Sequence, residues 1–206
     1  IRYEWLHGAT TGRNGDTGSG AEILLQNIQR SRSFILAGIG AEYHLTKTTE
    51  WYANLSQAYR PIQFANLQAP PTTDVVDPEL KDANGYNFDL GYRGKLKNYL
   101  QFDASVFYLQ YNNRVGTITP TGASYRLITN VGASSSKGFE GYVEFNPVKK
   151  FTTSKFADLI IFGSYGYTDA QYSGNHKDAS TKGKKVENAP ENIVRAGITA
   201  GYKGFY

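Results

Sequence analysis

Hydrophobic and polar residues alternate along much of this chain. The clearest case is segment 86–93, whose apolar positions are Tyr86, Phe88, Leu90 and Tyr92. An alternation with a period of two places one set of side chains on one face of a β-strand and the other set on the opposite face. The same period predicts strands at 35–45, 50–60, 98–112, 138–147 and 194–202. A helix is excluded there, because alternating residues would be scattered around a helix instead of forming a stripe.

Two further strands are predicted with less regular patterns. Segment 157–170 is apolar on both faces, so its orientation stays open, and a strand is also expected at 1–7. A long strand is expected to start near Tyr125, and the stretch that begins there is its upstream half. The pattern therefore predicts about eight strands.

The predicted connections fall into two classes. Short turns are expected at 46–49, 94–97 and 147–150, whereas long polar loops are expected at 8–32, 61–84, 113–124 and 171–192. Along the chain the long loops all fall at one end of the strands and the short turns at the other. Outer-membrane barrels have this asymmetry, with short periplasmic turns and long extracellular loops.

Two fold classes remain open at this point, an antiparallel transmembrane β-barrel and a soluble secreted β-sandwich. Aromatic residues gather near the strand ends, as they do at membrane interfaces. The face opposite the apolar one carries isolated charges, which are Asp89, Arg93, Asp103, Glu140, Glu144 and Arg195. The dry core of a sandwich would not tolerate these charges, whereas a wet lumen would, so the barrel is favoured.

Composition agrees with a barrel once the strands are recognised. Mean hydropathy is −0.47, and no run approaches the ~18 apolar residues of a transmembrane helix. A barrel strand needs only about 9–11 residues and turns half of them toward the lumen. The chain also has 16 tyrosines, a residue suited to a boundary between water and an apolar phase.

Enzymatic and nucleic-acid functions find little support. The chain has no cysteine, and its histidines are only His7, His44 and His176, on separate elements without ligand spacing. A net charge of +4 without a basic stripe does not indicate nucleic-acid binding. Asp77, Glu79 and Asp82 lack the glycine and terminal glutamate of a calcium-binding loop, which leaves only weak calcium binding open. We expect no catalytic residue, no resident metal and no cofactor.

Several short blocks resemble TonB-dependent receptors. The blocks keep the order and spacing of that family over most of 30–205, and they are 51–61 (WYANLSQAYRP), 76–81 (VDPELK), 86–94 (YNFDLGYRG), 130–132 (NVG), 137–141 (KGFEG) and 187–192 (ENAPEN). Within the family, 60–64 (RPIQF) with the following loop is most similar to the ferric-citrate-type siderophore receptors.

The resemblance implies a fold and a location. Such receptors are outer-membrane barrels of 22 strands with an N-terminal plug domain. Residues 1–206 would then be part of one β-barrel domain, from its C-terminal portion, without the plug domain and without the final strands.

The resemblance also implies a function, which is import of a ferric chelate such as ferric citrate or another siderophore. TonB would act through the plug domain, and outer-membrane lipid and lipopolysaccharide would surround the barrel. An anionic chelate calls for guanidinium and amide groups at the extracellular mouth. The candidate ligand-binding residues are Arg60, Gln63, Arg114 and Arg126. For each of them, a solvated loop residue or a paired charge in the wall is the alternative.

Other functions stay open on the sequence alone. The same scaffold could import a glycan or a vitamin, and aromatic residues on the inner loops would favour a sugar. A self-contained eight-stranded outer-membrane barrel with an adhesive or structural role is a further alternative, as is a soluble binding module.

Overall fold

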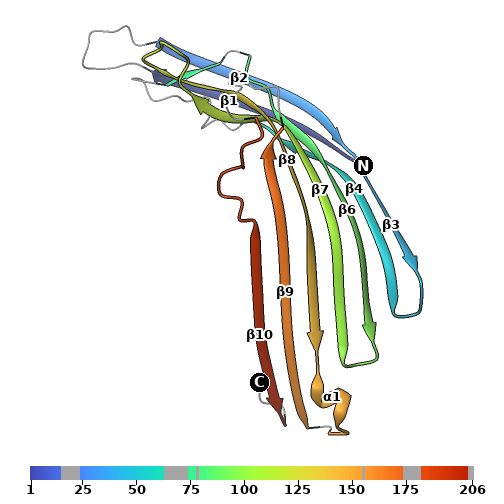
Figure 1. Cartoon of the computed structure of the whole chain (residues 1–206). Coiled ribbons are helices and arrows are strands. Elements are labelled where there is room, and N and C mark those ends of the chain that lie inside the picture. The colour runs from blue at the N-terminus through green and yellow to red at the C-terminus, as the bar shows by residue number, and fades with distance from the viewer. Residues whose placement is uncertain (15–23, 63–73, 78, 155, 174–181, 204–206) are drawn as a thin grey trace.

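A computed structural model shows a tall, curved wall of β-strands (Figure 1). It describes residues 1–14, 24–62, 74–77, 79–154, 156–173 and 182–203. The elements follow the chain in the order β1 Arg2–Asn14, β2 Leu24–Leu36, β3 Gly38–His44, β4 Thr49–Arg60, β5 Asp74–Val76, β6 Ala83–Leu96, β7 Leu100–Ile118, β8 Arg126–Phe145, α1 Pro147–Phe151, β9 Ala157–Tyr172 and β10 Asn192–Tyr202. The all-β prediction is confirmed.

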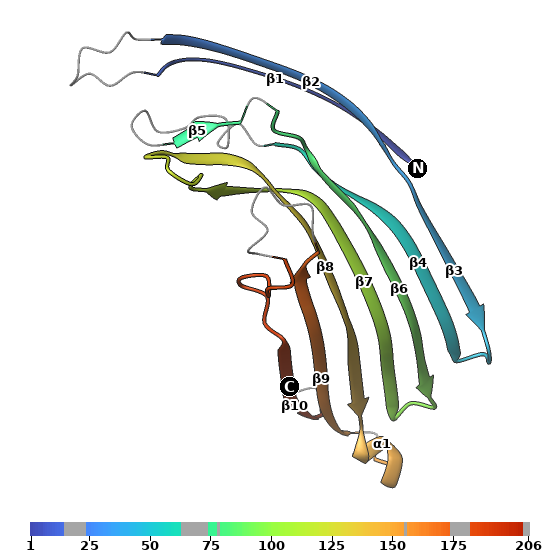
Figure 2. The ribbon, with the colours of Figure 1, turned by 45° about the horizontal axis from the view of Figure 1, so that its top comes forward.

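The strands form two sheets. The larger sheet has eight strands in the order β10-β9-β8-β7-β6-β4-β3, with β5 paired to β8 off this path. All its neighbours along the path are antiparallel, and β5–β8 is the parallel pair. β1 and β2 form a separate hairpin that leans away from the top of β4 (Figure 2). Within the described residues β3 and β10 do not pair, so the sheet is an open arc.

One face of the larger sheet is apolar and exposed. On β6 it presents Tyr86, Phe88 and Leu90, which are 43%, 39% and 38% exposed. The register aligns Phe88 with Tyr108 and Leu90 with Val106, so the apolar positions of neighbouring strands form one continuous band. This band, the apolar face, includes the even positions of β6 from Tyr86 to Leu96 and is uncovered by any described element. A sandwich would bury such a face beneath a second sheet.

The opposite face, the polar face, is a hydrogen-bonded network. The Tyr52 hydroxyl donates to Asp103 over 2.9 Å, and the Asn87 amide donates to Asp89 over 2.6 Å. Arg93 pairs with both Glu50 and Glu42. Charges and amides satisfy one another on this face, as they must where several polar groups share a partly enclosed surface.

The orientation of segment 157–170, which the sequence left open, follows from the ladder. Phe139 of β8 pairs with Tyr167 and Phe145 with Ile161, so the odd positions of β9 lie on the apolar face. Ile161 and Tyr165 are accordingly 43% and 39% exposed. The even positions lie on the polar face beside Glu140 and Glu144.

Two predicted connections are wrong in extent. The expected loop 8–32 is largely strand, because β1 continues to Asn14 and β2 begins at Leu24. The expected loop 113–124 is shortened by β7, which continues to Ile118. In both places runs of polar residues, 29–33 in β2 and 112–114 in β7, interrupt the alternation by which a strand is recognised in the sequence.

The expected turn at 147–150 is a single helical turn, α1. Asn146 caps it by accepting from the Lys149 backbone N–H over 2.9 Å, and Pro147 occupies the first turn. An Asn cap followed by proline is a common way to start a helix. The remaining connections at this end, around 45–48 and 97–99, are short, as predicted.

The only cluster of buried hydrophobic residues found among the described residues lies at the long-loop end. Ile62 and Leu80, 6% and 4% exposed, pack with Val76 and Val115. They hold the segment that returns from β5 to β6 against the upper parts of β7 and β8. This small core gives the long-loop end a defined shape on which a site can be built.

Candidate functional site

Four strands converge at the long-loop end around a pocket of about 270 Å³. We call this the mouth pocket, and its lining is Arg60, Pro61, Ala83, Tyr111, Arg114, Val115, Gly116, Thr117 and Ile128. Two of the nine lining residues are arginines, and none is acidic. The mouth pocket is therefore electropositive, and a phenol group lies between its aliphatic walls.

An irregularity in β7 places Arg114. Asn113 has a left-handed backbone with φ of 54°, and the ladder to β8 shifts between Tyr111 and Val115. Asn tolerates this conformation better than most residues, and an extra residue in one strand redirects the side chains that follow. Arg114 is thereby directed to the polar face, where its guanidinium lies 3.4 Å from the Ser134 hydroxyl.

A tyrosine and a glutamate position Arg114 further. Its guanidinium lies over the Tyr172 ring, 5.4 Å from the centroid, and the Tyr172 hydroxyl donates to Glu187 over 2.5 Å. Burial and this hydrogen bond raise the pKa of Tyr172, and the same bond lowers the pKa of Glu187. Glu187 therefore stays anionic near Arg114 and holds segment 182–187 against the end of β9.

Arg60 ends β4 on the polar face of the sheet. It is exposed, and in the described part of the chain no carboxylate lies within 4 Å of it. Arg114 lines the same pocket as Arg60, and an anion in the pocket would be attracted by both cations. The pair Arg60 and Arg114 is thus the feature of the mouth pocket that points to a ligand.

The structure separates the other two predicted site residues from this pair. Arg126 lies opposite Asp74 in the β5–β8 ladder and outside the lining of the mouth pocket. Gln63 lies outside the described residues. Binding by any of the four predicted residues stays a prediction.

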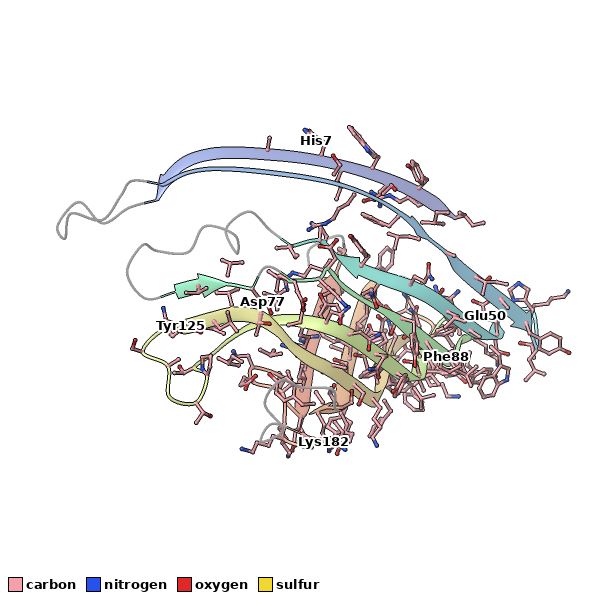
Figure 3. All side chains as sticks on the ribbon, turned by 90° about the horizontal axis from the view of Figure 1, so that it is seen from above. His7, Glu50, Asp77, Phe88, Tyr125 and Lys182 are labelled. Carbon is pink, nitrogen blue, oxygen red and sulfur yellow. The ribbon has the colours of Figure 1, made fainter. Side chains whose placement is uncertain are left out.

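Sequence reasoning missed the residues that hold the loop behind the pocket. Asp77 is 7% exposed; its backbone N–H donates to the Ile128 carbonyl over 2.9 Å, and its carboxylate accepts from the Thr129 hydroxyl. Asn130 donates to the carbonyls of Lys81 and Asn113. Figure 3 shows Asp77 beside the upper part of β8, near Tyr125. A polar loop gives no periodic signal for such contacts.

Asp82 connects the loop to the β1–β2 hairpin. Its carboxylate accepts from the Tyr59 hydroxyl and from the Ile62 backbone over 2.9 Å, and it pairs with Arg32 at 2.7 Å. Burial and the bond to Asp82 raise the pKa of Tyr59 to about 12. Asp77 and Asp82, which the sequence left open as weak calcium ligands, are committed to protein donors.

A second polar cluster lies at the short-turn end. Glu42, His44 and Glu50 bring ligand atoms within 4.8 Å of one another. Arg93 already occupies both carboxylates, at 2.6 Å from Glu50 and 3.0 Å from Glu42, and His44 pairs with Glu50 at 2.7 Å. A guanidinium among the ligands opposes a cation, so this is an ion-pair network in the wall.

Comparisons with known proteins agree with this architecture. No helix in the described ranges is long and apolar enough to cross a membrane. Residues 1–206 match the family described as TonB dependent receptor-like, beta-barrel. A search of curated proteins finds no match.

Three solved structures share the fold at low sequence identity. The ferric-catecholate import receptor Fiu of E. coli K12, in a closed form, is 17% identical over 97% of this chain and 30% of its own, with a TM-score of 0.61. The copper transporter OprC is 18% identical over 82% and 25%, with a TM-score of 0.60. The unliganded ferric citrate transporter FecA is 18% identical over 85% and 24%, with a TM-score of 0.58. The chain thus spans under a third of the length of each.

Proposed function

Because the chain belongs to the TonB-dependent receptor β-barrel family, we propose that it forms part of the wall of a transporter that imports an anionic ferric chelate, ferric citrate or another siderophore. The family is an outer-membrane one and its members are receptors and transporters, not enzymes. The short turns then face the periplasm and the long loops the outside of the cell. The polar face lines the lumen, and the apolar face contacts lipid.

The observation that carries the proposal is the pair of arginines in the mouth pocket. Arg60 and Arg114 come from β4 and β7, and no acidic residue shares the lining. Guanidinium groups bind carboxylates through charge-assisted hydrogen bonds, often two at once. A chelate that displays carboxylates would satisfy both arginines at the extracellular mouth of the lumen.

The size of the mouth pocket refines the substrate class. A volume of about 270 Å³ is below the roughly 300–1,000 Å³ of sites that enclose a drug-sized ligand. The mouth pocket therefore accommodates one carboxylate-bearing arm of a chelate. The remaining contacts would come from other parts of the barrel and from the plug domain, on which TonB would act.

A sugar or vitamin as cargo is the competing proposal on the same scaffold. Sugar sites present aromatic rings whose faces are free to stack. Tyr172 has its ring beneath the Arg114 guanidinium. This arrangement favours an anionic cargo over a neutral glycan.

The test is a binding measurement on the whole receptor with ferric citrate, a ferric hydroxamate and a ferric catecholate. Hydrogen bonds to charged groups contribute about 1.5–3 kcal/mol, so R60A and R114A should each weaken binding of the cognate chelate by about 10–100-fold. K182A, which removes a cation from an exposed loop residue, is the matched control. Unchanged affinity in both arginine variants would refute the assignment of the site.

A further inference from the structure

The periplasmic end of the wall carries lysines at every described connection. They are all exposed and are Lys47, Lys95, Lys97, Lys149, Lys150 and Lys203. Segments 45–48, 95–99 and 147–154 contain no acidic residue. The turns at this end are therefore basic, and the carboxylates nearby, Glu42, Glu50 and Asp158, belong to the strands and are paired with Arg93 or Lys149.

An exposed apolar side chain adjoins the lysines at each of these connections. The four are Leu45, Leu96, Phe151 and Tyr202, which are 56%, 50%, 74% and 59% exposed. A lysine can place its aliphatic stem along apolar surface while its ammonium group stays in a polar layer. Repetition of this pairing at four separate connections indicates one shared environment, the boundary between hydrocarbon and headgroups.

The best-defined part of this boundary lies between α1 and the β6–β7 turn. We call it the rim patch: Lys97, Tyr99, Phe145, Lys150 and Phe151. The Lys150 ammonium lies 4.3 Å from the Tyr99 ring centroid and donates to the Tyr99 hydroxyl over 3.2 Å. The Phe145 ring meets the rings of Tyr99 and Phe151 edge-on, each at 6.3 Å.

The rim patch faces lipid. Phe145 pairs with Leu100 and Ile161, and all three belong to the apolar face, so the patch continues the lipid-contacting band downward. Lys149, one residue before Lys150, pairs instead with Asp158 at 3.4 Å, and Asp158 is on the polar face. Lys149 and Lys150 of α1 thus lie on opposite faces of the sheet.

We propose that the rim patch binds the headgroup phosphate of an anionic phospholipid in the periplasmic leaflet. The ammonium groups of Lys97 and Lys150 and the Tyr99 hydroxyl are donors for a phosphodiester. Phe145 and Phe151 provide apolar surface for the start of the acyl chains, and aromatic residues favour this depth. Because the patch continues the lipid-contacting surface, a lipid fits it better than a soluble acidic protein. The proposal depends on orientation in the membrane and not on the imported cargo.

The experiment uses the whole receptor reconstituted in vesicles of equal parts phosphatidylglycerol and phosphatidylethanolamine. After mild extraction, lipid mass spectrometry measures the ratio of the two lipids retained by the protein. Each lysine near an anionic surface contributes a several-fold preference for anionic lipid, so removal of two charges in K97Q/K150Q should lower the retained ratio by about 30-fold. K182Q/K184Q removes the same charge at the extracellular end and should leave the ratio unchanged.

Two results would overturn the proposal. One is an unaltered ratio in K97Q/K150Q, which is also the outcome expected if the patch serves an acidic protein. The other is an equal decrease in both double variants, which would indicate a general effect of net charge. The wild-type receptor adds an independent measurement: its preference for phosphatidylglycerol should fall as salt rises, because ionic strength screens exposed charges. A ratio insensitive to salt in wild type contradicts the proposal even if a variant fails to fold.

Discussion

Individual polar residues decide the shape of the extracellular end. Asp82 joins Arg32 of β2, Tyr59 of β4 and the backbone of Ile62 in one contact set. Both partners of the Arg32–Asp82 pair are largely buried, with side chains 17% and 15% exposed. Loss of one partner from a buried pair leaves an uncompensated charge. Asp82 therefore fixes how the β1–β2 hairpin meets the loop behind the mouth pocket.

A single residue, Glu187, should also make the protection of segment 182–187 depend on pH. The hydrogen bond from Tyr172 lowers the pKa of Glu187 below its ordinary value of 4.5. A group with a lowered folded pKa contributes stability above its unfolded pKa and loses it as pH falls through the folded pKa. Backbone hydrogen bonds also hold segment 182–187 on β9, so we expect its protection to be full at neutral pH and to weaken as the pH falls below the ordinary pKa of Glu187, 4.5.

Hydrogen exchange of segment 182–187, normalised for intrinsic rates, measures this protection. E187Q should show weaker protection at neutral pH and little further change on acidification. A conserved pH response in E187Q would assign the loss of protection to another group. Y172F removes the principal cause of the lowered pKa and should shift the transition toward higher pH.

At the scale of elements, alternation predicted the strands only where lipid contacts one face. β6 was expected at 86–93 and spans Ala83–Leu96, and β10 was expected at 194–202 and spans Asn192–Tyr202. Residues 29–33 (QRSRS) are polar at every position, so this part of β2 gives no alternation in the sequence. For the same reason the loop 8–32 was predicted too long. The alternation of hydrophobic and polar residues reflects what each face of a strand contacts. It does not show how far the backbone hydrogen bonds between strands continue.

The candidate site also has a part that the sequence predicted and a part that it could not predict. The sequence identified Arg60 and Arg114 separately, since charge and position near a strand end are visible in one dimension. Their meeting in one pocket depends on the irregularity at Asn113 and on the register of β4, β6 and β7. The support from Asp77, Thr129 and Asn130 depends on a loop folding back on distant strands. Neither has a periodic signature.

A charge placed on the apolar face of a strand should lower the free energy of unfolding. Phe88 lies mid-way along β6 in the lipid-contacting band, and an arginine at the bilayer midplane of a barrel costs about 2–4 kcal/mol. F88R should lower the unfolding free energy of the receptor in bilayers by that amount, while F88L should have a much smaller effect. S124R, at an exposed position in the connection between β7 and β8, should change it by under about 1 kcal/mol.

Denaturant titration in lipid vesicles, followed by tryptophan fluorescence, measures these differences. Equal costs for F88R and S124R would mean that the middle of β6 and this exposed connection experience the same solvent. That result would remove the distinction between the apolar band and the connection between β7 and β8.

At the scale of the whole molecule, the wall has two chemically different faces and two different ends. The lumen face is a network of paired charges that narrows to an electropositive mouth pocket. The lipid face is an apolar band with a basic, aromatic rim at the periplasmic end. The proposed import of an anion and the proposed anchoring in an anionic leaflet thus involve separate surfaces, which mutations can address independently.

The account depends on β6 standing in the membrane with its even positions toward lipid. The most direct test is a spin-label scan along residues 84–96 of the whole receptor in bilayers, with oxygen and a water-soluble nickel complex as relaxants. Labels at Tyr86, Phe88 and Leu90 should respond to oxygen, and labels at Asn87 and Asp89 should respond less to oxygen, giving a period of two. Equal access of the nickel complex to both sets, or a period near 3.6, would contradict the account.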